Sequence, residues 1–89
     1  MRPESKPGAK QELDLHGLTV DEAVPQVEDF IYRAYLAGHV NVWIIHGKGT
    51  GVLKGAVSRS LAGNSLVRSF YTADKYHGGD GATQANLVL

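Results

Sequence analysis

The feature that most constrains the fold is the apolar run VNVWII at residues 40–45, which lies between Gly38 and Gly47. The run is rich in β-branched and aromatic residues and is too short for a typical helix, so it predicts a strand. Its nearly continuous apolar character predicts that both faces of this strand are covered. We therefore expect residues 40–45 to lie at the centre of a sheet.

The sequence before this run predicts a strand followed by a helix. The segment ELDLH at residues 12–16 alternates apolar and polar side chains, which predicts a short strand. Thr19 and Glu22 have the spacing of a capping box, and the apolar residues after them recur every three or four positions as far as Gly38. Pro25 lacks an amide hydrogen, so we expect this helix to begin loosely or to kink there.

The sequence after the run predicts one more helix and two more strands. Apolar residues within 53–61 give a shorter helix, and we expect Gly63 or Asn64 to adopt the left-handed conformation at its end. Residues 66–73 and 82–89 predict the third and fourth strands. The order β-α-β-α-β-β implies an α/β fold, a two-layer sandwich of two helices on a four-stranded mixed sheet.

Length and composition predict one small domain in the cytoplasm. The chain has 89 residues and no cysteine, and no apolar run approaches the 18 residues of a membrane span. Residues 1–11 include two prolines and three basic side chains, which predicts a linker or tail, with the domain at 12–89. Such a tail suggests that the domain is a piece of a longer protein.

The charges are unevenly distributed although they sum to zero. Residues 11–29 carry six acidic side chains and no basic one, whereas residues 30–75 carry six basic side chains and one acidic one. Zero net charge argues against strong general affinity for nucleic acid. The basic half nevertheless allows a basic binding face, and the alternative is a set of ordinary solvated charges.

Polar residues gather where the first two predicted strands end. Asp14 and His16 lie at the end of the first strand, and His46 and Lys48 follow the second. Because parallel strands end at the same edge of a sheet, we expect these side chains to meet. In one mechanism, His16 or His46 is a general acid or base that Asp14 orients, or Asp14 activates a nucleophile, and Lys48 stabilises a phosphoryl transition state.

Two other uses of the same residues remain open. Asp14 could bind a divalent metal together with one or both histidines. Alternatively, nothing is cleaved, and the amides of residues 47–51 hold a phosphate at the start of a helix. Purely structural roles also fit, because Asp14 could close a turn, His16 could be an ordinary rim residue and the glycines could only permit positive φ.

Three segments together resemble the Smr (small MutS-related) domain. They are LDLHG at 13–17, IIHGKGTG at 44–51 and GGDGATQANL at 78–87. The resemblance extends over residues 12–89 and is strongest to the C-terminal Smr domain of the second bacterial MutS paralogue family. It implies a fold similar to the C-terminal domain of bacterial translation initiation factor three.

The resemblance also implies a function and partners. It implies a nicking endonuclease domain that acts on DNA, often branched DNA, within a larger MutS-like protein that suppresses recombination. The alternative is a non-catalytic module that binds DNA junctions, RNA or ribosomes. No membrane partner is expected.

By position, the resemblance assigns roles to individual residues. Asp14 and His16 match the family's DxH element and are predicted to be catalytic, with His46 either assisting catalysis or only holding the loop in shape. Six residues of the glycine loop and the helix after it are predicted to bind nucleic acid: Gly47, Lys48, Gly49, Thr50, Gly51 and Lys54.

Overall fold

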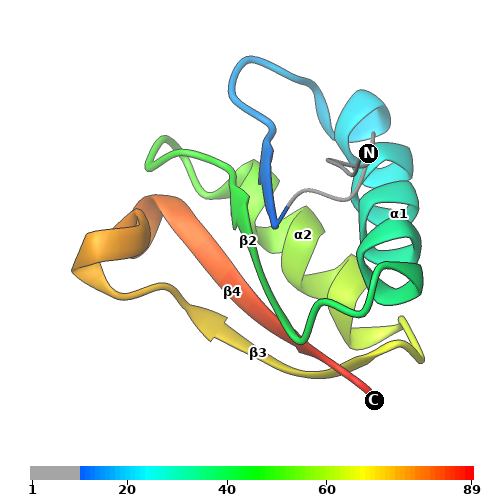
Figure 1. Cartoon of the computed structure of the whole chain (residues 1–89). Coiled ribbons are helices and arrows are strands. Elements are labelled where there is room, and N and C mark those ends of the chain that lie inside the picture. The colour runs from blue at the N-terminus through cyan, green and yellow to red at the C-terminus, as the bar shows by residue number, and fades with distance from the viewer. Residues whose placement is uncertain (1–10) are drawn as a thin grey trace, which may run out of the picture.

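The computed structural model describes residues 11–89, so the predicted linker lies outside the described residues except for Gln11. Four strands and two helices follow one another in the order β-α-β-α-β-β, with two short 3₁₀ turns before the last strand (Figure 1). The elements are β1 (Glu12–Asp14), α1 (Val20–Leu36), β2 (Asn41–Ile45), α2 (Val52–Ala62), β3 (Val67–Thr72), η1 (Lys75–His77), η2 (Gly79–Gly81) and β4 (Ala82–Leu87).

The strands form one mixed sheet in the order β1-β2-β4-β3. β1 pairs with β2 in parallel, and β4 runs antiparallel to both of its neighbours. The last strand of the chain is therefore inserted between β2 and β3. The predicted four-stranded mixed sheet is confirmed, and β2 has a neighbour on each side as expected for a central strand.

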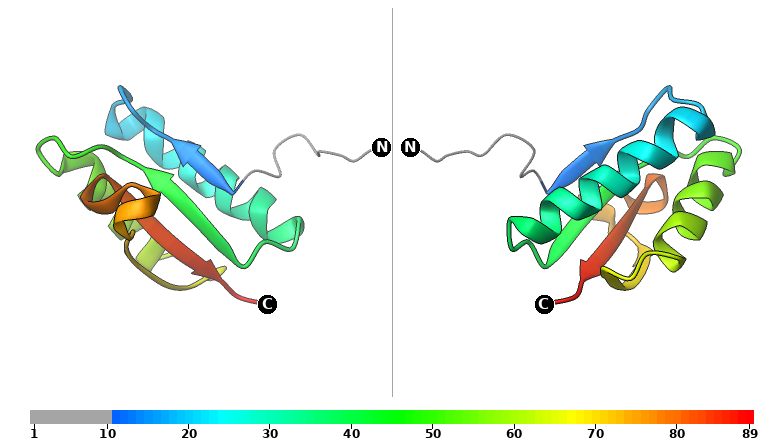
Figure 2. Two further views of the ribbon diagram at one scale, coloured as in Figure 1. Left: turned by 60° about the vertical axis from the view of Figure 1, so that its left-hand side comes forward. Right: turned by 90° about the vertical axis from the view of Figure 1, so that its right-hand side faces the viewer.

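Both helices pack on the same face of the sheet, and the 3₁₀ turns lie on the other side (Figure 2). Val42 and Ile44 of β2 are fully buried, whereas Trp43 and Ile45 are only partly buried. Because successive side chains of a strand point to opposite faces, Val42 and Ile44 face the helices and Trp43 lies on the open face. The prediction that both faces of β2 are covered therefore holds fully for the helix side and only in part for the open face.

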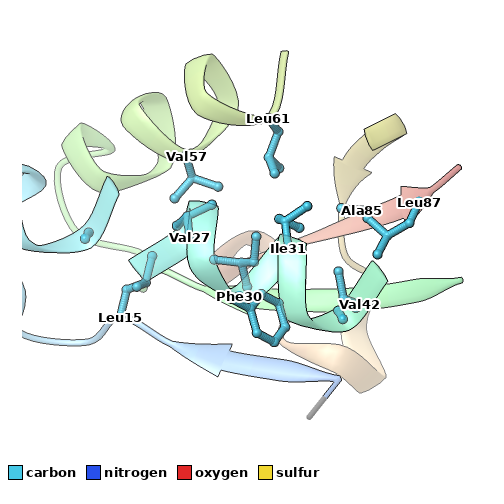
Figure 3. Packing of buried hydrophobic residues seen from close by; sticks show 12 residues of the cluster. Leu15, Val27, Phe30, Ile31, Val42, Val57, Leu61, Ala85 and Leu87 are labelled. Atoms are coloured by element: carbon cyan, nitrogen blue, oxygen red, sulfur yellow. The ribbon is translucent and has the colours of Figure 1, made fainter. Parts of the chain in front are cut away.

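The hydrophobic core lies between the helices and the sheet (Figure 3). It draws fully or almost fully buried side chains from both helices, from the turn after β1 and from the central strands: Leu15, Val27, Ile31, Val42, Val57, Leu61, Ala85 and Leu87. Truncating a buried leucine or isoleucine to alanine typically costs about 2–5 kcal/mol. This core therefore holds both helices against the sheet.

α1 begins at a well-defined capping box. The Oγ1 atom of Thr19 accepts a hydrogen bond from the Glu22 amide at 3.2 Å, and the Glu22 carboxylate accepts one from the Thr19 amide at 2.9 Å. The helix continues through Pro25 to Leu36 as one element. The expected loose start is therefore wrong, because the cap fixes the first turn before the proline is reached.

The end of α2 also differs from the prediction. Gly63 has φ of −91°, and no non-glycine residue among residues 11–89 has positive φ. The Gly63 amide instead donates to the carbonyl of Arg59 at 3.2 Å, and the Asn64 amide donates to that of Leu61 at 3.1 Å. The prediction of a left-handed cap at Gly63 or Asn64 is therefore wrong, because the chain leaves the helix through a turn that keeps right-handed φ.

Candidate active site and phosphate-binding loop

The glycine loop joins the end of β2 to the start of α2. Gly47 and Gly51 have φ of +83° and +88°, a region that other residues rarely adopt. The N-cap residue of α2, Gly51, has no side chain to cap the helix, and the first turn contains no acidic residue. The hydroxyl of Thr50 accepts one hydrogen bond from the Val52 amide at 3.4 Å. The remaining amides of the first turn and the positive end of the helix dipole therefore favour an anion at this point.

A cleft of about 270 Å³ lies between this loop and the start of α1. Five of the six residues predicted to bind nucleic acid line it: Gly47, Gly49, Thr50, Gly51 and Lys54. Lys48, the sixth, is exposed on the same loop. At the opposite wall, α1 has a filled capping box and the acidic residues Asp21 and Glu22 in its first turn. Of the two helix starts that border this cleft, only that of α2 has the electrostatic character that favours an anion.

Asp14 is the last residue of β1, and His16 lies in the turn that follows it. One carboxylate oxygen of Asp14 accepts a hydrogen bond from the His16 amide at 2.8 Å, and both side chains are exposed. Asp14 therefore closes this turn, which is one of the structural roles that fitted the sequence. Within residues 11–89 the structure gives this carboxylate no other hydrogen-bond partner, so a second oxygen remains for a substrate or a water molecule.

His46 lies apart from that pair. The residue is 5% exposed, and its ring places Nδ1 3.0 Å from the carbonyl of Gly47 and Nε2 2.9 Å from the hydroxyl of Thr83. The carbonyl can only accept, so Nδ1 donates, and in the neutral ring Nε2 accepts from Thr83. Asp14 pairs in register with Ile45, so strand alternation places Asp14 on the open face and His46 on the helix side.

The structure thus brings the predicted residues together only in part. Asp14 and His16 share one turn, and the glycine loop follows the neighbouring parallel strand at the same edge of the sheet. His46 is buried with both ring nitrogens occupied, which favours the alternative that it holds the loop in shape. Its predicted catalytic role stays a prediction.

Sequence reasoning missed the organisation of residues 74–81. One carboxylate oxygen of Asp74 accepts hydrogen bonds from the Tyr76 amide and from Nδ1 of His77, both at 2.8 Å. The hydrogen bond from His77 is the main reason why the pKa of Asp74 lies below its ordinary value. The carbonyl of Gly81 accepts from the amides of His46 and Gly47, each at 2.9 Å. Residues 74–81 therefore hold the start of the glycine loop in place through these two backbone hydrogen bonds.

The ring of His77 stacks on Trp43, with ring centroids 4.7 Å apart and planes 12° from parallel. Both rings line an open cleft of about 810 Å³ on the face of the sheet without helices, and Asp14 lines the same cleft. The signal that could have indicated this contact is the position of Trp43 between two core residues, which places an aromatic ring on the open face.

Within residues 11–89, no group of three or more His, Asp or Glu side chains is placed to hold a metal ion. The metal-binding alternative therefore has no support from the part of the chain that the structure describes. No helix in that part is both long and apolar enough to cross a membrane.

The sequence matches the Smr domain family over residues 13–88. It is 49% identical over 77 residues to a protein named endonuclease MutS2 from Pelotomaculum thermopropionicum, an alignment that covers 86% of this chain and 10% of that protein. A protein of the same name from Anaeromyxobacter is 40% identical over 86 residues, which covers 97% of this chain and 11% of that protein. The chain thus spans about a tenth of the length of these relatives.

Two crystal structures share the fold. The Smr domain of Thermus thermophilus MutS2 superposes with a TM-score of 0.86 at 38% identity, which covers 90% of this chain and all of that one. YdaL, a stand-alone small MutS-related protein from Escherichia coli, superposes with a TM-score of 0.83 at 35% identity, which covers 86% of this chain and 63% of that one. The β-α-β-α-β-β arrangement is therefore that of an Smr domain.

Proposed function

Because the chain belongs to the Smr domain family, we propose that it is a DNA-binding endonuclease domain that nicks one strand. The relatives named endonuclease MutS2 support a nuclease function, and their length supports a larger MutS-like protein around this domain. In that setting, nicking of branched DNA would serve to suppress recombination. Fold alone does not decide among the activities that one fold can host, so the proposal rests on the site.

One observation carries the proposal. The exposed Asp14–His16 turn and the uncapped start of α2 follow two adjacent parallel strands, so a carboxylate–imidazole pair and a phosphate-attracting helix end share one edge of the sheet. A strand of nucleic acid that crosses this edge can place one phosphate on the glycine loop and another beside Asp14. Acid–base groups next to held phosphates are what phosphodiester hydrolysis requires.

The residues then have distinct roles in the proposed reaction. Asp14 orients the attacking water and His16 transfers a proton, both at the exposed turn. Lys48 and the loop amides neutralise phosphate charge that develops in the transition state. His46 acts as a positioning residue, because its two hydrogen bonds join the loop to β4.

The test is nicking of supercoiled plasmid DNA, with and without a chelator. The Asp14→Asn variant retains an oxygen that can accept from the His16 amide but loses the negative charge, so the turn is preserved. We expect this variant to lose at least 100-fold in nicking rate, the size of effect common for acid–base groups. Glu28→Gln removes an exposed carboxylate from α1 and serves as the control. Wild-type nicking by Asp14→Asn would remove Asp14 from the mechanism.

The second candidate is a binding module for DNA junctions or for RNA on ribosomes, with no chemistry of its own. The specific observation in its favour is that the phosphate-attracting cleft and Asp14 lie on different sides of the sheet, so the cleft does not depend on the acid–base pair. This candidate predicts salt-sensitive binding of labelled DNA or RNA and no product strands after long incubation in either metal condition.

A further inference from the structure

The side chain of His77 is exposed, but contacts with the rest of the protein restrict the position and orientation of its ring. We propose that it is a general base of the nicking reaction, acting in the cleft that it shares with Asp14. The inference rests on the proposed nuclease function and adds to it a residue from the segment before β4. Three structural constraints on the ring support it.

The first constraint is the carboxylate of Asp74. Its oxygen lies 2.8 Å from Nδ1 of His77 and accepts a hydrogen bond from it. The bond fixes the proton of a neutral ring on Nδ1, which leaves the lone pair on Nε2. The His77 side chain is 47% exposed, so the ring is accessible to a substrate or to water. A carboxylate that fixes the tautomer of an adjacent histidine in this way is a recurrent arrangement for a general base.

The second constraint is the stack on Trp43. With centroids 4.7 Å apart and planes 12° from parallel, the indole sets the plane of the imidazole. The backbone that carries Trp43 is fixed, because its neighbours Val42 and Ile44 are fully buried in the core. The stack and the hydrogen bond to Asp74 thus reduce the entropy that is lost when the His77 ring is oriented for proton transfer.

The third constraint is the backbone after the ring. Gly78 has φ of +110°, and a Cβ built there would lie 2.7 Å from the Cβ of Ala82. The chain therefore turns back immediately after His77, and only glycine fits this turn without a shift of the neighbouring strand. As a result, the position of His77 over the open face is set by the start of β4.

These constraints place His77 near Asp14. Trp43 pairs in register with Glu12 on the parallel strand β1, and Asp14 is two residues further along β1, so Asp14 and Trp43 share one face of the sheet. The His77 ring, which stacks on Trp43, therefore lies on the same face of the sheet as Asp14. Both residues line the same cleft of about 810 Å³. His46, by contrast, has no ring nitrogen left for a substrate.

The proposed step balances with one water molecule. The water oxygen forms a bond to phosphorus and gives one proton to Nε2 of His77. The bond from phosphorus to the leaving sugar oxygen breaks, and that oxygen takes a proton from protonated His16. His77 then loses its proton to solvent, and His16 regains one from solvent. The net reaction consumes one water and yields a phosphomonoester and a sugar hydroxyl.

The experiment compares plasmid nicking by the full 89-residue chain with nicking by His77→Phe and His77→Ala. Phenylalanine keeps a flat ring on Trp43 but has no nitrogen, so it separates stacking from proton transfer. We expect both variants to lose at least 100-fold in rate while the dissociation constant for DNA changes less than twofold. Asp74→Asn, which disturbs the tautomer, should lose at least tenfold. Asp80→Asn changes an exposed carboxylate in the same segment and is the control.

A pH profile provides a readout that a structural role would not alter. A general base must be deprotonated, so the wild-type rate should fall as the pH is lowered, and this acid limb should flatten in His77→Phe. The other titratable groups around the ring are Asp74 and, along the cleft, Glu12, Asp14 and His39. All of them remain in His77→Phe, so a flattened limb identifies His77 as its source.

The outcomes separate this inference from the proposed function. Wild-type nicking that persists in a folded His77→Phe, with its acid limb intact, overturns the role of His77 and leaves the nuclease proposal standing. Absence of nicking by the wild-type chain, while Lys48-dependent DNA binding is retained, overturns both. If His77→Ala does not fold, as judged by circular dichroism, His77→Phe and Asp74→Asn decide the matter.

Discussion

The Nε2 atom of His46 lies 2.9 Å from the Oγ1 atom of Thr83, a residue 37 positions further along the chain. This buried hydrogen bond joins the end of β2 to β4. The other ring nitrogen bonds the carbonyl of Gly47, so the same histidine connects the glycine loop to the sheet. The geometry of the loop therefore depends on a contact between two distant parts of the sequence.

Replacing Thr83 by valine tests this contact. The variant keeps the shape of the side chain but leaves Nε2 of His46 buried without a partner, so we expect the free energy of unfolding to fall by about 1–3 kcal/mol. Urea denaturation measures the change. Thr72→Val is the control, because Thr72 is the exposed cross-strand neighbour of Thr83 on β3. Equal effects of the two substitutions would show that the bond contributes nothing specific.

The glycine loop allows folding to be separated from binding. Alanine at Gly47 would have φ of +83°, and we expect a loss of about 1–2 kcal/mol in unfolding free energy. Gly49 does not have a positive φ, and a Cβ built there has no atom within 4 Å. The unfolding free energy of Gly49→Ala should therefore lie within about 0.5 kcal/mol of the wild-type value. A loss of DNA affinity in this stable variant would mean that the substrate backbone approaches Gly49 closely.

Lys48 should contribute to binding mainly through its charge. We expect Lys48→Ala to weaken DNA binding for all sequences and to reduce the slope of log K against log salt concentration by about 1. Titrations of labelled DNA at several salt concentrations measure both quantities. Arg33→Gln is a suitable control, because that guanidinium is already paired with Asp29 at 2.8 Å on α1. A slope that changes equally in both variants would argue against a specific phosphate contact at Lys48.

The pair of Asp74 and His77 predicts a pH effect with a definite sign. The hydrogen bond from His77 lowers the pKa of Asp74 in the folded protein. Its stabilising contribution is therefore complete above the ordinary aspartate pKa of about 3.9, and it is lost as the pH falls through the lowered value. His77→Ala should raise the pKa of Asp74 toward its ordinary value.

A carboxyl ¹³C NMR titration measures that pKa directly. Tyr76→Ala is the matched control, because it removes an exposed side chain while keeping the amide that donates to Asp74. If His77→Ala leaves the Asp74 titration unchanged, the hydrogen bond between the two side chains is absent in solution.

Much of the fold follows from local signals in the sequence. The Thr19–Glu22 capping box is present as predicted, and Val42 and Ile44 give the core-facing side of β2. These signals were sufficient because they act over a few residues. No local signal predicts the position of β4 between β2 and β3, because nothing in residues 82–87 indicates which strands they pair with.

The candidate site could be predicted only where it depends on strand ends. Asp14, His16 and the glycine loop lie at the same edge of the sheet because parallel strands end at the same edge. This position can be predicted without knowledge of side-chain contacts. The burial of His46 and the stack of His77 on Trp43 depend on partners far away in sequence. Tertiary packing selects such pairs, and residue spacing does not reveal them.

The insertion of β4 between β2 and β3 also bears on when the domain can form. β2 and β3 never pair with each other, and Ala85 and Leu87 fill part of the core. A nascent chain that ends at residue 81 would thus expose an incomplete sheet with two unsatisfied strand edges. We expect folding on the ribosome to wait for the last strand, and this delay exposes the intermediate to aggregation.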